Sequence, residues 1–90
     1  MPFAALKVKI MPESPEIDLQ IIEDTAKEII ESLGGKFHSK EIELIAFGLK
    51  AIIVLIAWPE DQEFDTLEQK LSQIENVSSA QIVDFRRAVG

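Results

Sequence analysis

An unbroken run of eight apolar residues, Ala51–Trp58, restricts the folds open to this chain more than any other segment. It is far shorter than the roughly 20 residues that a helix needs to cross a bilayer. Continuous apolar runs of this length are typical of strands that are buried on both faces. The run therefore predicts a central strand of a sheet, over about residues 49–58.

The residues before this run predict a second strand and an unusual corner. Over residues 36–47, apolar side chains alternate with charged ones, as in a strand. The two strands are joined through Phe47, Gly48, Leu49 and Lys50, whereas tight hairpins favour Asn-Gly or Asp-Gly. An apolar corner with one cation indicates a contact surface rather than a solvated turn. The alternating residues are Glu41, Ile42, Glu43, Leu44, Ile45 and Ala46.

The first part of the chain predicts a strand and then a helix. Residues 3–11 alternate as in a half-buried strand, which Pro12 and Pro15 end. An apolar stripe with helical spacing follows, with Asp18 as the expected N-cap and Gly34 and Gly35 as the stop. The stripe comprises Leu19, Ile22, Ala26, Ile29 and Leu33, and the acidic residues Glu23, Asp24, Glu28 and Glu31 fall on the solvated side.

The last third predicts a second helix and a last strand. Leu67, Leu71 and Ile74 have helical spacing, and Asn76 is the expected stop. Asp65 and Glu68 have the spacing of a capping box, with Asp in place of Ser or Thr. Residues 77–87 predict a strand that ends in Arg86 and Arg87.

The predicted order of elements is β-α-β-β-α-β, which is that of a split βαβ unit. Right-handed crossovers then give an α+β ferredoxin-like sandwich, a four-stranded antiparallel sheet backed by two helices. Residues 1–90 are expected to form a single domain.

Charge and composition narrow the classes of partner. The chain has 16 acidic and 9 basic residues, a net charge of −7, so phosphate backbones and anionic membranes are disfavoured partners. Lys7 and Lys9 interrupt any hydrophobic signal region near the start. Cysteine is absent, which excludes disulfides and thiolate metal sites. We expect a cytoplasmic location and a protein partner.

Catalytic or metal-binding constellations are missing from the sequence. His38 is the only histidine and is expected to make a local hydrogen bond. Glu41 and Glu43 are interpreted as a solvated strand face, and the acidic residues 60–63 as a solvated turn. The glycines form no phosphate loop. The chain is therefore expected to need no cofactor or metal of its own and to perform no bond-making chemistry.

Three segments carry a family resemblance. They are Met11–Pro15 after the first strand, Ile45–Ala51 at the hairpin and Asn76–Arg87 at the end. Together they resemble the archaeal form of translation elongation factor 1 beta, over essentially the whole chain. The resemblance implies the same βαββαβ fold. It also implies a guanine-nucleotide exchange factor that binds elongation factor 1 alpha, the GTPase that delivers aminoacyl-tRNA, and speeds GDP release so that GTP can rebind.

The resemblance also implies which residues meet the partner. In eukaryotic relatives, the aromatic residue before the hairpin glycine contacts the GTPase, and it corresponds to Phe47. Gly48 would permit the corner that presents the ring, and Lys50 flanks it. The alternative is that Phe47 fills the edge of the sheet.

The carboxy-terminal end departs from the eukaryotic pattern. Eukaryotic relatives have a next-to-last lysine that reaches the magnesium site of the GTPase, whereas this chain has Val89 there. Either Arg86 or Arg87 substitutes for that lysine, or the magnesium-displacing step is managed differently. Two cations suit a phosphate or carboxylate partner, and the alternative is an exposed strand end.

Two other functional classes fit the same fold. One is a regulatory ligand-binding domain that dimerises through its apolar third strand. The other is a small hydrolase of acylphosphatase type, which would need an arginine after the first strand, yet residues 11–16 contain none.

Overall fold

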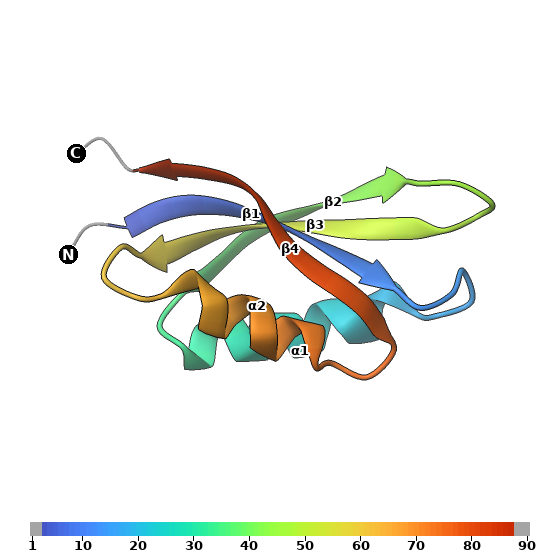
Figure 1. Ribbon diagram of the computed structural model, residues 1–90, viewed down its shortest axis with the longest axis horizontal. Coiled ribbons are helices and arrows are strands. Elements are labelled where there is room, and N and C mark those ends of the chain that lie inside the picture. The colour runs from blue at the N-terminus through green and yellow to red at the C-terminus, as the bar shows by residue number, and fades with distance from the viewer. Residues whose placement is uncertain (1–2, 88–90) are drawn as a thin grey trace.

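The computed structural model describes residues 3–87, and of Arg87 it describes the backbone alone. Four strands form one antiparallel sheet, and both helices lie on the same face of it (Figure 1). The elements are β1 (Phe3–Pro12), α1 (Leu19–Ser32), β2 (Lys36–Leu44), β3 (Lys50–Pro59), α2 (Phe64–Ser72) and β4 (Val77–Arg87). The predicted α+β ferredoxin-like sandwich is therefore confirmed.

The sheet has the strand order β2-β3-β1-β4, which makes β3 and β1 the central pair. Their antiparallel register places Leu6 opposite Ile56 and Val8 opposite Val54. The apolar run Ala51–Trp58 is thus central, as predicted. Because β3 is hydrogen-bonded on both sides, it offers no free edge for pairing with another chain.

The core lies between the sheet and the two helices. Trp58 is fully buried there, and its Nε1 donates a hydrogen bond of 3.4 Å to the carbonyl oxygen of Gln62 in the following turn. Side chains of α1 and α2 close the other side of this layer. The largest fully buried side chains are Trp58, Leu6, Ile10, Ile22, Ile30, Ile52, Ile56, Leu67, Leu71, Val8 and Val54.

The opposite face of the sheet carries neither of these helices (Figure 1). Lys9 lies opposite Ile53 in β3, and Glu43 lies opposite Ala51. Their side chains meet across β3, where Lys9 Nζ lies 3.2 Å from Glu43 Oε1. The aliphatic stem of the lysine thus covers apolar strand surface, and Ala51 is fully buried although no helix packs on it. Glu43 belongs to a cross-strand ion pair rather than to a merely solvated face.

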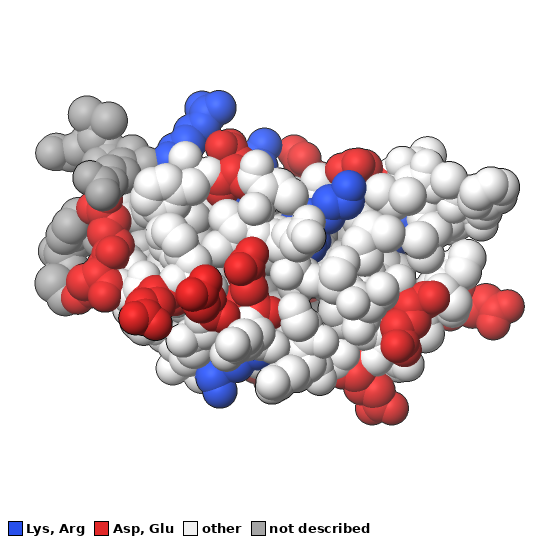
Figure 2. Space-filling view, in the orientation of Figure 1, with Lys and Arg blue, Asp and Glu red and all other residues white. Residues whose placement is uncertain are grey.

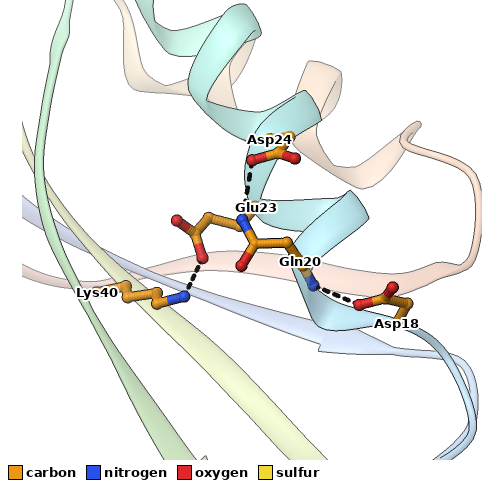
Figure 3. Close-up of polar contacts among 5 residues, drawn as sticks. All are labelled: Asp18, Gln20, Glu23, Asp24 and Lys40. Atoms are coloured by element: carbon orange, nitrogen blue, oxygen red, sulfur yellow. Dashed lines mark hydrogen bonds and ion pairs between the residues drawn. The ribbon is translucent and has the colours of Figure 1, made fainter.

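Helix α1 begins and ends where the sequence predicts. Asp18 Oδ1 accepts a hydrogen bond of 2.9 Å from the backbone N–H of Gln20 (Figure 3). At the other end Gly34 has a φ of +94°, the left-handed conformation that stops a helix. A Cβ on Gly35 would lie 2.8 Å from Trp58 Cε3, so the second glycine is required by close packing.

One expectation for α1 is wrong. Glu23 was expected on the solvated side, yet its carboxylate receives Lys40 Nζ from β2 in an ion pair (Figure 3). Only 14% of the Glu23 side chain is exposed. The helix therefore bonds to the edge strand β2 through its acidic side as well as packing on the core through its apolar stripe.

The expected capping box at α2 is also wrong. The N-cap is Glu63, whose side chain makes no capping hydrogen bond, and Asp65 lies inside the first turn. Glu68 instead accepts a hydrogen bond from the backbone N–H of Ile82 in β4. The Glu68 carboxylate therefore bonds to β4 and not to the N-terminal end of its own helix, as a capping box would require. The helix ends at Ser72, before Ile74, and Gln73 is its C-cap, so the expectation that Asn76 is the stop is wrong. Asn76 instead lies in the turn before β4, with a positive φ of 71°.

Strand β2 is shorter than predicted. It ends at Leu44, because the backbone N–H of Ile45 donates to the carbonyl oxygen of Leu49 and closes a loop. Near this end of β2, the side chains of Ile42 and Leu44 are 47% and 75% exposed. The alternation of apolar residues at the end of β2 therefore reflects an apolar surface and not a buried face.

We expect Asp18→Ala to lower the free energy of unfolding by about 1 kcal/mol, because one backbone donor of α1 loses its acceptor. Urea unfolding followed by circular dichroism measures this change. Glu28→Ala, which removes an exposed carboxylate from the same helix, is the control. Equal stability of the Asp18 and Glu28 variants would contradict the assigned capping role.

Candidate functional site

The connection between β2 and β3 is a tight turn with an unusual residue in it. The N–H of Leu49 donates to the carbonyl oxygen of Ala46 at 2.9 Å, so Phe47 and Gly48 are the two central residues. Both have positive φ, +54° for Phe47 and +81° for Gly48. Hairpin turns with two such residues favour Asn-Gly, since a bulky side chain in the left-handed region is strained by about 1–2 kcal/mol. The turn holds an aromatic ring at a cost in stability.

The ring of Phe47 makes no compensating contact within the part of the chain that the structure describes. It is 100% exposed, so it does not fill a gap at the sheet edge. Three neighbouring apolar side chains, Ile42, Leu44 and Ile45, are also at least 37% exposed. We refer to these four residues as the apolar tip. Figure 2 shows the projecting end of the hairpin almost free of charged side chains. Strained outliers and contiguous apolar patches both mark sites of function.

Lys50 lies next to the apolar tip. It is exposed and opposite Leu44 in the register, so the two side chains share the helix-facing side of the hairpin. There Lys50, Gly48 and Pro15 line a groove of about 400 Å³ between the hairpin and the turn after β1. The hairpin motif and the proline turn, which are distant in sequence, are therefore neighbours.

The arginines at the end of β4 lie at the other end of the molecule. β4 runs away from the α1 N-terminal end, and its last residues lie opposite to the β2–β3 turn along the long axis (Figure 1). That axis measures 41 Å, against 21 and 18 Å for the others. The structure thus brings the predicted residues Phe47, Gly48 and Lys50 together in one candidate site, whereas Arg86 and Arg87 lie at the remote end of the molecule.

Arg86 is the better defined of these two arginines. It pairs with Ala5 of β1, and 81% of its side chain is exposed. Its Nε lies 3.4 Å from Asp84 Oδ2, an ion pair that leaves the rest of the guanidinium available. Arg87 pairs with Ala4 through its backbone. Val89, at the position of the eukaryotic lysine, lies outside the described residues.

Sequence reasoning missed an irregularity just before this end. Val8 lies opposite Ile82, but Lys7 lies opposite Asp84, so Val83 is an extra residue in β4. The signal was present, because the adjacent apolar residues Ile82 and Val83 break the two-residue alternation of a strand.

Over residues 3–87, no three His, Cys, Asp or Glu side chains are grouped so that they could hold a metal ion. Neither α1 nor α2 is long and apolar enough to span a membrane. His38 Nδ1 lies 3.2 Å from Ser39 Oγ, which confirms the expected local hydrogen bond.

Comparison with known proteins gives the family. Residues 5–88 match the family described as the EF-1 guanine nucleotide exchange domain. The chain belongs to this family. It is 45% identical to elongation factor 1-beta of Metallosphaera sedula, over 89% of both chains. It is 39% identical to the protein of the same name from Nanoarchaeum equitans, over 90% of this chain and all of the relative. For a Methanococcus maripaludis relative the identity is 37%, over 88% of this chain and 90% of the relative.

The resemblance to archaeal elongation factor 1 beta is therefore confirmed, and with it a place among the exchange factors of translation elongation. The match begins in β1 and runs past the end of β4, so it includes both the apolar tip and the arginines.

We expect Phe47→Asn to raise the free energy of unfolding by about 0.5–1 kcal/mol, because asparagine tolerates the left-handed conformation better than phenylalanine does. Urea unfolding gives the change. The control is Leu44→Asn, since Leu44 is an exposed apolar residue of the same hairpin without positive φ, and this variant is not expected to gain stability. A loss of stability in Phe47→Asn would show that the ring stabilises the fold.

Proposed function

We propose that this chain binds elongation factor 1 alpha and promotes release of its GDP, so that GTP can rebind. The chain itself makes and breaks no bond in this proposal; it acts as a single exchange unit, in the cytoplasm where elongation takes place. The observation that carries the proposal is the fully exposed Phe47, held in a strained turn at one end of an elongated body. Membership of the exchange-domain family supports the same conclusion.

A strained and exposed ring has a physical use only when it is buried by something else. Burying a phenylalanine side chain contributes about 1.5–3 kcal/mol. The rigid turn has already fixed the backbone of Phe47, so little further ordering is needed when the ring docks. We assign the apolar tip and Lys50 to the part of the interface that supplies binding energy.

An exchange factor must do more than bind. It shifts the GTPase toward a conformation with weakened nucleotide contacts only by as much as it prefers that conformation. Two contacts at opposite ends of a stiff sheet have a fixed separation. A GTPase conformation that satisfies both contacts is therefore favoured over one that satisfies only the first. We assign Arg86 and Arg87 to the second contact, near the bound phosphates and magnesium.

The cationic end suits that role by its charge. In a chain of net charge −7, Arg86 projects from the strand end with most of its guanidinium exposed. A guanidinium binds phosphate or carboxylate oxygens through two parallel hydrogen bonds. It could compete with magnesium for those oxygens, and this competition would weaken the hold on GDP.

The chain should accelerate loss of a fluorescent GDP analogue from elongation factor 1 alpha. Phe47→Ala should raise the concentration needed for half-maximal acceleration by about 10- to 100-fold, the equivalent of one buried phenylalanine ring. Stopped-flow fluorescence against a concentration series measures it. Ile21→Ala, which shortens another exposed apolar side chain on α1, should behave as the unchanged chain does. Equal loss in both variants would refute a specific contact at Phe47.

The double variant Arg86→Ala, Arg87→Ala should act differently. We expect its maximal rate at saturation to fall by about tenfold or more, since charge-assisted hydrogen bonds contribute about 1.5–3 kcal/mol. The half-maximal concentration should change less than in Phe47→Ala. Lys70→Ala removes an exposed cation from α2 and is the control. An unchanged maximal rate in the double variant would exclude these arginines from the nucleotide step.

A further inference from the structure

One face of α2 contacts β4 on both sides of the extra residue Val83. Phe64 and Glu68 are one helical turn apart, so they lie on the same face of α2. Glu68 contacts Ile82, immediately before Val83, and Phe64 contacts Phe85, two residues after it. The two contacts bracket the bulge.

The Glu68 contact is a hydrogen bond to the outer edge of the sheet. β4 is an edge strand, and the N–H of Ile82 donates to Glu68 Oε2 at 2.8 Å. This amide would otherwise be available to water or to a strand of another molecule. A carboxylate acceptor makes a stronger bond with a backbone N–H than a neutral group does. Glu68 is half-buried, so the bond is partly shielded from water.

The Phe64 contact is aromatic. The ring centroids of Phe64 and Phe85 are 5.1 Å apart and the planes are inclined at 56°, a favourable tilted arrangement. This contact fixes the strand on the far side of Val83. Between the two contacts, Val83 itself is 49% exposed, so packing on Val83 alone does not determine where the bulge lies.

The bulge decides which face of the sheet Arg86 occupies. In a regular strand, residues two and four apart share a face, so Arg86 would share the helix-facing side with Ile82. The extra residue reverses this alternation. Phe85 lies opposite the buried Leu6, and Arg86 lies opposite Ala5, whose side chain is on the face without helices. Removal or displacement of the bulge would turn Arg86 to the other side.

We propose that Glu68 is a positioning residue for nucleotide exchange. Together with Phe64 it holds the bulge at Val83, and the bulge presents Arg86 on the open face of the sheet at the end of β4. Glu68 touches neither partner nor nucleotide; it acts through the strand that carries the arginines. The inference rests on the proposed function, and it names an acidic residue of α2 as necessary for the action of a cation on β4.

The test compares Glu68→Ala and Glu68→Gln in the GDP-release assay with elongation factor 1 alpha. Glu68→Ala should lower the maximal rate by about tenfold. A displacement of a reacting or contacting group by about 1 Å can lower a rate by up to about 100-fold, so a loss of this size is expected when Arg86 is misplaced. The half-maximal concentration should stay nearly constant, because the apolar tip is at the other end. Glu68→Gln retains an acceptor oxygen and should recover most of the rate. Gln69→Ala, at the neighbouring exposed position of α2, is the control.

A double-variant cycle separates positioning from general destabilisation. In a chain that already carries Arg86→Ala and Arg87→Ala, Glu68→Ala should cause no further loss of rate. Hydrogen exchange of the Ile82 amide, measured by NMR on the folded variants, should be faster in Glu68→Ala than in Glu68→Gln. This measurement also shows whether the alanine variant is folded at the assay temperature.

Several outcomes would overturn the inference. A maximal rate in Glu68→Ala equal to that of the unchanged chain would do so, as would an equal loss of rate with and without the arginines. If Glu68→Ala did not fold, the Glu68→Gln variant would decide. A folded Glu68→Gln with the full rate but an unprotected Ile82 amide would overturn the inference, because exchange would then not need the hydrogen bond to Ile82. An unchanged chain that fails to accelerate GDP release would instead refute the proposed function itself. The two failures are therefore distinguishable.

Discussion

The antiparallel pairing of β1 with β3 is the constraint on which the rest of the structure depends. It spans Phe3 to Ile10 on one strand and Ile52 to Pro59 on the other, and its helix-facing side chains form the floor of the core. Both edge strands take their register from this pair, β2 from β3 and β4 from β1. The hairpin turn follows the end of β2, and the arginines lie at the end of β4. The same pairing that builds the core thus separates the two candidate contacts.

The helices contribute to this arrangement through their polar sides as well as their apolar ones. Glu23 of α1 pairs with Lys40 of β2, and Glu68 of α2 binds the backbone of β4. Each helix is therefore attached to the edge strand beside it. In a small sheet whose other face carries no helix, such attachments limit how far the edges can bend away from the central pair. These two attachments support the stiffness that the proposed exchange mechanism requires.

The sequence was sufficient to predict the fold because its periodic patterns agree with one another. The apolar run of β3, the stripe of α1 and the caps at Asp18 and Gly34 all led to observed elements. The predictions that failed for Glu23 and Glu68 concern side chains with a choice between a local and a distant partner. Glu68 could cap its own helix or bind β4, and nothing local in the sequence decides between them.

The candidate site was predictable in part, for a similar reason. The unusual Phe-Gly corner is visible in the sequence, but its left-handed φ and full exposure emerge only from the folded turn. That Phe47 and Arg86 lie at opposite ends of a 41 Å body depends on the strand order, which single-strand patterns do not specify. The consequence of the bulge at Val83 for the direction of Arg86 requires the register of β4 on β1.

The elongated shape also has an evolutionary consequence. In the proposed mechanism, the distance between the contacts at the two ends of the body must match the GTPase. Each residue added along a strand lengthens that strand by about 3.3 Å and reverses the alternation of the side chains after it. Insertions and deletions should therefore be tolerated in the turns at residues 60–63 and 73–76, because changes there leave the length of the strands unaltered. Insertions and deletions within the β2 and β3 arms of the hairpin, or in the second half of β4, should be selected against unless the GTPase surface changes to match.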